Sequence, residues 1–316
     1  MTLRIGSFLV VGLLMAAAAS AQTHPLRGPE GNDATVEPDQ PVRPQMPALI
    51  QRPAQPPVAQ QPAQPQPAKP PFTLTPEEEA QVDRVLKQWE ERNREIQTFD
   101  CRFKRWIYDV VFGPPNQAKS VEIGVLKYKA PNCGLFRIDS TETDGKASPI
   151  DNSRAEHWIA DGKSIFEYSP AKKQVIERKL PKELQGKAIA DSPLPFLFGA
   201  EAAKLKQRYF IRLITPANVQ DQIWLESYPR YQQDAANFHH AQFIITTQKM
   251  EPYGLKIIQP NEKDYTTYQF FEIVINDKLR FFRGDPFRPF TPLGWQKVID
   301  EAPAAQASRV RSDGPR

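Results

Sequence analysis

Three histidines, His157, His239 and His240, are the residues best suited to acid–base chemistry or metal binding in this chain. An imidazole titrates near neutral pH and is a common metal ligand, so these positions are the first to test for catalysis. His239 and His240 are adjacent and come just before a predicted strand, where neighbouring side chains point to opposite faces. Because a catalytic or metal-binding pair must converge, this spacing favours a role at the surface or at a strand edge.

Carboxylates offer a second route to catalysis. Asp161 is followed by Gly162, a pair typical of a tight hairpin turn, which explains this aspartate without a catalytic role. The pairs Asp139/Glu142 and Asp264/Glu272 lie in sequence surroundings that indicate no assembled acid–base site. No Gly-x-Ser-x-Gly, His-Glu-x-x-His or Gly-rich phosphate loop occurs. The sequence therefore predicts a protein that is not an enzyme, and a hydrolytic enzyme is the weakest alternative.

Composition excludes other classes of function. The chain has 316 residues with 41 Lys+Arg, 37 Asp+Glu and a net charge of +4, of which residues 72–300 hold 33 basic and 31 acidic side chains. Binding to nucleic acid needs a concentrated basic stripe, and this near-balance predicts none. After the N-terminus there is no apolar run of about 20 residues, so no integral membrane span is expected.

The N-terminus has the pattern of an export signal. Residues 1–21 contain Arg4, an apolar stretch over 8–18 and the small residues Ala19-Ser20-Ala21. This order predicts a cleaved signal peptide and a periplasmic or otherwise exported protein, with an uncleaved anchor as the alternative. Because no cysteine follows the cleavage site, a lipid-anchored N-terminus is not expected.

Residues 22–71 are rich in proline, alanine and glutamine and hold 14 of the 32 prolines. Such a segment has little apolar surface to bury and predicts a disordered spacer. A docking ligand for a proline-binding domain is the alternative. The folded domain is expected over 72–300, followed by a disordered tail over 301–316.

The two cysteines, Cys101 and Cys133, cannot supply a four-ligand zinc site. Export would permit a disulfide between them. However, Cys101 falls early in a first predicted strand and Cys133 at the start of a third, so two ladder steps would hold them roughly 9–10 Å apart. That exceeds the limit of about 7 Å for a bridge, although curvature of the sheet could close the gap. Both pairing and a simple core role for Cys101 stay open.

The folded domain begins with a helix and continues with strands. Thr75, Pro76 and Glu78 form a capping-box pattern, and apolar residues at helical spacing predict one amphipathic helix over 76–96. Period-two alternation then predicts short antiparallel strands at hairpin spacing over 99–112, 121–129, 135–138, 158–159, 164–168, 174–179, 209–214, 222–226, 242–247, 255–258 and 265–275. The segment 181–206 interrupts them with a helical insert.

This order predicts an α+β fold with one large curved antiparallel sheet. About ten antiparallel strands rarely stay flat, so the sheet is expected to curl and to have a concave face. Aromatic-rich concavities bind apolar ligands. Strand parity gives the candidate ligand-binding residues of that face as Phe99, Phe103, Val121, Ile123, Phe136, Ile138, Phe166, Phe210, Phe271 and Ile273.

Five segments together resemble, in order, the LolA/LolB family of periplasmic lipoprotein carriers. The strongest is the hairpin over 158–175, which contains Asp161-Gly162-Lys163 and ends in Gln174-Val175. The others are the strand at 99–103, the turn Lys129-Ala130-Pro131-Asn132, the lid-like segment 192–199 and the closing segment 287–294. The chain is also similar to an uncharacterised group of exported planctomycete domains.

The resemblance implies an unclosed β-barrel with a hydrophobic lining, an N-terminal helix and a helical lid insert. It implies binding of lipoprotein or lipid acyl chains, no cofactor and no catalysis, with Leu194, Phe196, Leu197 and Phe198 as the lid. In LolA-type carriers an arginine of the Lys-Arg-Pro-Asn turn latches the lid, and Ala130 occupies that position here. The fold is therefore expected to carry over better than the transfer mechanism.

Two further alternatives stay open. An envelope regulatory or sensor protein of the same fold would bind a protein partner without transferring lipid. A structural protein would fill the concave face with its own side chains, because aromatic residues are usually buried for their apolar surface alone.

Overall fold

The computed structural model describes residues 68–115, 117–180, 185, 201–279, 282 and 284–300. Contacts divide the chain into two units, and all of these residues belong to one of them. The predicted signal peptide, most of the predicted spacer, the tail and the lid residues Leu194, Phe196, Leu197 and Phe198 lie outside the described residues. Within the described part, no helix is long and apolar enough to cross a membrane.

The N-terminal helix, α2 (Pro76–Arg94), confirms the predicted capping box. The Thr75 hydroxyl accepts a hydrogen bond from the Glu78 backbone N–H at 3.3 Å, and the Glu78 carboxylate accepts one from the Thr75 N–H at 2.8 Å. These reciprocal bonds satisfy amide groups that the first turn leaves unpaired. The apolar stripe of α2, which includes Val82, Leu86 and Trp89, is buried.

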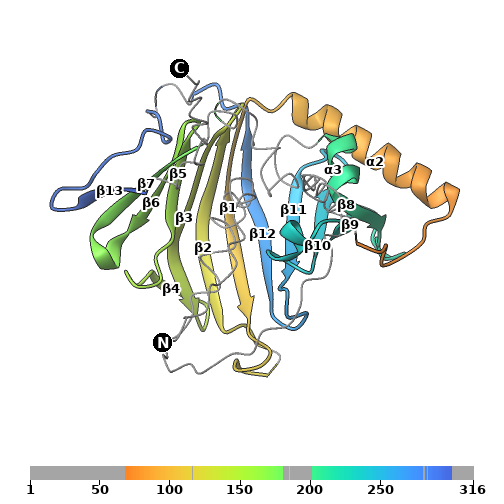
Figure 1. Cartoon of the computed structure of the whole chain (residues 1–316), viewed down its shortest axis with the longest axis horizontal. Helices are drawn as coiled ribbons and strands as arrows, with labels where there is room; N and C mark the ends of the chain where they lie inside the picture. Colours follow the sequence, from red (N-terminus) through yellow and green to blue (C-terminus); the bar gives the residue numbers. More distant parts are fainter. Residues whose placement is uncertain are drawn as a thin grey trace, which may run out of the picture. The chain divides into compact units, whose positions relative to one another are not determined.

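A single sheet of 13 strands dominates the described residues (Figure 1). Its strands are β1 (Thr98–Tyr108), β2 (Ser120–Lys129), β3 (Cys133–Thr143), β4 (Lys146–Pro149), β5 (His157–Asp161), β6 (Ser164–Ser169), β7 (Gln174–Lys179), β8 (Tyr209–Leu213), β9 (Gln222–Pro229), β10 (His240–Thr246), β11 (Pro252–Ile258), β12 (Tyr265–Ile275) and β13 (Gln296–Asp300). They run in the order β13-β7-β6-β5-β3-β2-β1-β12-β11-β10-β9-β8, with β4 paired to β3.

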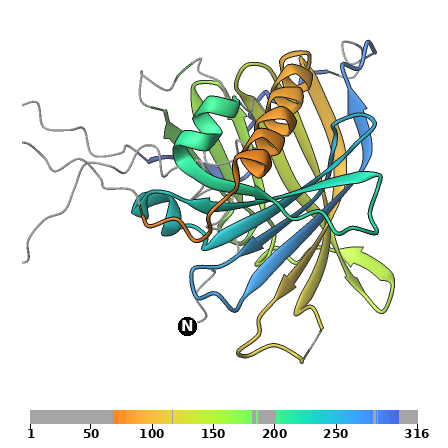
Figure 2. The same ribbon diagram turned by 90° about the vertical axis from the view of Figure 1, so that its right-hand side faces the viewer.

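The sheet is not closed by hydrogen bonds, because its path ends at β13 on one side and at β8 on the other. Every pair is antiparallel except β13 with β7, which is parallel. The helices α2 and α3 (Ala202–Arg208) lie next to each other on the same side of the sheet (Figure 2). The predicted α+β fold with a curved, unclosed antiparallel sheet is therefore confirmed.

The Asp161-Gly162 hairpin and the Pro131-Asn132 turn contact each other. The Asp161 carboxylate accepts hydrogen bonds from the backbone N–H groups of Lys163 and Ser164, each at 2.8 Å. Gly162 has a φ of +91°, a conformation that favours glycine. The Asn132 side-chain amide donates to the Gly162 carbonyl at 3.0 Å. Asp161 therefore has a structural role in the turn.

Three elements were missed by the sequence patterns: β4, β13 and the short helix α4 (Gln232–Ala235). In addition, β1 ends at Tyr108 instead of continuing to residue 112, and α2 ends at Arg94 instead of residue 96. The strand β13 was missed because all five of its residues are exposed, so it has no buried alternation.

Candidate functional site

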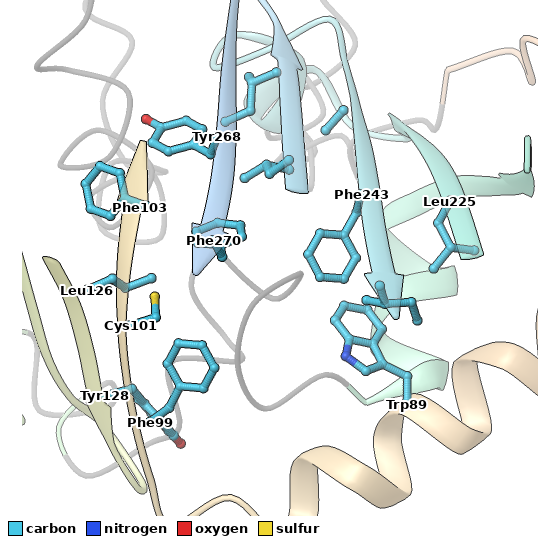
Figure 3. Close-up of a cluster of buried hydrophobic side chains, with 14 of the residues drawn as sticks. Trp89, Phe99, Cys101, Phe103, Leu126, Tyr128, Leu225, Phe243, Tyr268 and Phe270 are labelled. Atoms are coloured by element: carbon cyan, nitrogen blue, oxygen red, sulfur yellow. The ribbon is translucent and has the colours of Figure 1, made fainter. Parts of the chain in front are cut away.

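The face of the sheet that packs with α2, called the inner face below, holds the larger of two hydrophobic clusters. Side chains from β1, β2 and β12 face side chains from β9, β10 and α2 across this cluster (Figure 3). Its fully buried members include Trp89 from α2, Phe103 from β1 and Phe243 from β10, each at most 1 % exposed. Trp89 and Phe243 pack with ring centroids 4.8 Å apart. The inner face thus joins the two halves of the sheet through apolar contacts.

A row of aromatic rings crosses the inner face from β12 to β5. Tyr268 lies 5.7 Å from Phe103, Phe103 stacks on Phe136 at 4.9 Å, and Phe136 stacks on Trp158 at 5.7 Å between centroids. The strand β2 passes between Phe103 and Phe136, and its residue paired with Phe103 is Gly124. Because Gly124 has no side chain, the rings of β1 and β3 meet over β2.

A cluster of paired charges lies beside this aromatic row. Arg105 donates to Glu122 and to Glu156, each at 2.8 Å, and Arg154 donates to Glu122 at 2.8 Å. The Arg105 and Glu122 side chains are 2 % and 4 % exposed, whereas Arg154 is 47 % exposed and reaches solvent. The Arg105 guanidinium also lies 5.9 Å from the Phe136 ring.

Electrostatics keep the buried Arg105 side chain charged. Burial alone would lower the pKa of Arg105, but the Glu156 and Glu122 carboxylates beside it raise this pKa well above its usual value. Burial also raises the pKa of the neighbouring Tyr268 hydroxyl, which stays protonated. The inner face therefore combines a large buried apolar cluster with a compact charged region.

The ten residues predicted for the concave face divide between the two faces. Phe99, Phe103, Phe136, Ile138 and Ile273 lie on the inner face. The other five do not belong to its cluster, so the predicted facing is wrong for Val121, Ile123, Phe166, Phe210 and Phe271.

On β2 the error is one of parity. The buried positions of this strand are Glu122, Gly124, Leu126 and Tyr128, and the apolar residues Val121 and Ile123 alternate with them. A shift of one residue moves a whole strand pattern to the opposite face. The buried glutamate hid the true parity, because an acid is buried only where cations such as Arg105 and Arg154 pair with it.

The other three misplaced residues have local causes. Phe166 belongs to a second cluster that is covered by Phe287 and Trp295 from the C-terminal segment. Phe210 lies 4.0 Å from the Arg230 guanidinium, which covers its ring. Phe271 precedes Glu272, whose φ of +53° marks an irregularity that returns Ile273 to the inner face.

Sequence patterns missed several inner-face residues. Tyr268 and Phe270 alternate on β12 and are both buried, and the Arg105–Glu122 pair faces the same side. The signal that could have found them is the charge complementarity of Arg105 and Glu122, which face each other in the β1–β2 register.

His239 and His240 lie side by side, whereas His157 lies on β5. His239 and His240 were expected to point apart, but their Nδ1 atoms lie 2.9 Å from each other because His239 precedes the first residue of β10. His157 is stacked on Tyr168 at 4.2 Å, next to the second cluster. Among the described residues, no group of three or more His, Cys, Asp or Glu side chains could hold a metal ion.

The cysteines lie as the strand order predicted. Cys101 is a buried thiol on β1, and Cys133 is a thiol on β3, with β2 between them. Burial raises the pKa of the Cys101 thiol far above its usual value, so this side chain behaves as a small core residue.

Comparison with known proteins finds similarity at the level of solved structures. No protein-family model matches the sequence, and no curated protein matches it. An uncharacterised conserved protein from Thermus thermophilus is similar over 69 % of this chain and 98 % of its own, with 10 % identity and a TM-score of 0.38. A LolA superfamily protein from Nitrosomonas europaea is similar over 66 % of this chain and 99 % of its own, with 11 % identity and a TM-score of 0.32.

A third similar structure is that of a putative outer membrane lipoprotein-sorting protein domain from Vibrio parahaemolyticus. The similarity covers 63 % of this chain and 94 % of that domain, with 11 % identity and a TM-score of 0.31. One of these three structures carries the LolA superfamily name. None of them indicates the planctomycete branch, which stays a prediction.

Proposed function

We propose that this chain is an exported, LolA-like carrier that binds the acyl chains of lipoproteins, or of a similar lipid, on its inner face. The observation that supports it most is that one face of the sheet holds both a helix-covered aromatic cluster and the paired charges of Arg105, Glu122 and Glu156. Acyl chains would contact the apolar part, and the polar end of the ligand would lie toward the charged part. Transfer of an alkyl chain from water contributes ~0.8 kcal/mol per buried methylene.

The unclosed sheet suggests how a ligand enters. The edge strands β8 and β13 are not joined by hydrogen bonds, so these two edges can move apart without breaking a ladder, while β12 keeps the two halves of the sheet joined. The described polar contacts of α2 involve α3 and the segment before β11: Lys206 contacts Asp83 at 2.6 Å, and Arg92 donates to the Lys249 carbonyl at 3.2 Å. Movement of α2 with the β8–β11 half would therefore uncover the inner face.

The insert that follows β7 is proposed as the lid, with Leu194, Phe196, Leu197 and Phe198 as its apolar residues. Phe196→Asp is expected to weaken ligand uptake while the melting temperature changes little. A loss of uptake that only follows a loss of folding would contradict the lid role.

A structural protein is the second candidate, and the burial of the inner face favours it. Phe103 is 0 % exposed and Trp89 is 1 % exposed, as expected for side chains that simply fill a core. The two candidates differ in one respect. A carrier must open to admit an alkyl chain, whereas a structural core has no need to open.

A fluorescent fatty-acid titration of the mature chain tests the proposal. Saturable binding that a diacyl lipid competes away is expected, and no saturable binding by folded protein would favour the structural candidate. Two substitutions on β2 form a matched pair, because Leu126 is on the inner face and Val125 packs on the other side. Leu126→Gln should weaken binding of the probe, and Val125→Gln should not.

Co-purification distinguishes a carrier from a sensor. A carrier is expected to retain a lipoprotein or its acyl chains when isolated from the envelope. A sensor would instead retain a protein partner and release no lipoprotein to an acceptor membrane. Transfer of bound lipoprotein to acceptor vesicles therefore supports the carrier, and its absence in a protein that binds lipid supports the sensor.

A further inference from the structure

The Trp158 indole is buried on the inner face. Its side chain is 4 % exposed, and Nε1 has no hydrogen-bond partner in the part of the chain that the structure describes. A buried indole N–H normally donates a hydrogen bond, and leaving such a donor unpaired costs about 1–3 kcal/mol. An unpaired donor of this kind requires an explanation.

The ring of Trp158 is held in place by its neighbours. It stacks on Phe136 with an interplanar angle of 10°, and Phe136 in turn stacks on Phe103. The backbone around it is paired on both sides, with Phe136 of β3 and Glu167 of β6 as its cross-strand partners. The indole therefore cannot turn toward a neighbouring backbone carbonyl without breaking the aromatic row.

The nearby carboxylates already have donors. Glu156, two residues before Trp158, accepts from Arg105, and Glu122 accepts from Arg105 and Arg154. In the described part of the chain, Trp158 Nε1 has no acceptor. A free carboxylate would bring a charge into this buried region, where Arg105 and Arg154 are already paired with the two glutamates, whereas an ester carbonyl supplies an uncharged acceptor next to an alkyl chain.

We propose that the Trp158 indole N–H donates a hydrogen bond to the ester carbonyl of a bound acyl chain. This inference rests on the proposed function and narrows its ligand to acyl esters, in preference to free fatty acids or ether lipids. Trp158 is then a specificity-determining residue: the aromatic row binds the chain, and the indole selects the ester linkage.

Two lipids that differ only in this linkage test the inference. Diheptanoyl phosphatidylcholine and its diether analogue have the same headgroup and closely similar chains, and both are used below their micelle concentration with the full mature chain. A net hydrogen bond corresponds to a roughly 2- to 10-fold preference for the diester. Trp158→Phe should remove this preference, so that the ratio of the two affinities falls to about one, whatever the variant does to the affinity for both lipids.

Trp224→Phe is the matched control, because the Trp224 indole N–H already donates to the Gln222 side chain at 2.9 Å. This variant should keep the preference for the diester. A second measurement needs no folded variant: in the ¹⁵N-labelled wild-type chain, the Trp158 indole N–H resonance should shift with the diester and not with the diether.

The outcomes separate the inference from the proposed function. Binding of both lipids with equal affinity, or the same preference in wild type and Trp158→Phe, would overturn the role of Trp158 and leave the carrier proposal standing. Binding of neither lipid by folded protein would overturn both.

Discussion

Gly124 of β2 lies directly under the ring of Phe103. A Cβ atom at Gly124 would lie 2.6 Å from Cζ of Phe103, and it would also collide with the Arg137 carbonyl oxygen. The absence of a side chain at this position therefore allows two things: close approach of β2 and β3, and the stacking of Phe103 on Phe136 across them. The aromatic row of the inner face depends on this glycine.

Gly124→Ala is expected to destabilise the fold by at least about 2 kcal/mol, because the obstruction includes a backbone atom that cannot move aside. Urea denaturation measures the free energy of unfolding. Gly254→Ala is the control, since its nearest heavy atom, the Tyr268 carbonyl oxygen, lies 3.3 Å from the added Cβ. Equal losses in the two variants would show that Phe103 and Arg137 do not restrict Gly124.

Arg105→Met is expected to cost about 3–5 kcal/mol in unfolding free energy, because it leaves Glu122 and Glu156 without their buried partner. The adjacent Lys104 provides the comparison. Its pair with Glu142 spans 2.7 Å on side chains that are 28 % and 22 % exposed, so Lys104→Met should cost about 1 kcal/mol or less. A small loss of unfolding free energy in Arg105→Met would mean that water or a rearrangement compensates the charge of the two glutamates.

His157 makes stability depend on pH. Burial, and to a lesser extent Arg137, lower the pKa of His157 to about 4 from an ordinary value of 6.5, while Asp139 opposes the shift. Between these two pH values the unfolded chain binds a proton that the folded chain does not, so the unfolding free energy falls as the pH is lowered from 6.5 to 4.

The size of this loss approaches about 3 kcal/mol for a shift of this extent. Thermal unfolding of wild type and His157→Phe across pH 4 to 7.5 measures it. The variant should lose less stability on acidification, since the phenyl ring keeps the stack on Tyr168 without a titrating nitrogen. Parallel pH profiles would contradict the assignment.

The local elements followed from the sequence because their signals are local. The Thr75–Glu78 capping box fixed the start of α2, and Asp161-Gly162 fixed the β5–β6 turn, each through contacts within a few residues. Alternation gave most strands at nearly their observed bounds. The parallel partner of β7 could not be found, because pairing of β13 depends on a distant segment of the chain.

The candidate site was harder to predict because both faces of the sheet are partly covered. Phe166 and Phe136 are equally apolar, yet one faces the C-terminal segment and the other faces the inner cluster. Alternation specifies which residues share a face but not which face is covered by α2. Ion pairing adds a second ambiguity, since Arg105 and Glu122 are residue types that usually lie at the surface, yet here they lie in the core.

The most direct test of the carrier proposal is mass spectrometry of lipid extracted from the protein after isolation from its native envelope. The proposal predicts lipid with ester-linked acyl chains in near-stoichiometric amount, and less of it in Leu126→Gln than in Val125→Gln. Folded protein that is isolated without lipid, and that also takes up none from vesicles, would contradict the claim that the inner face is a binding site.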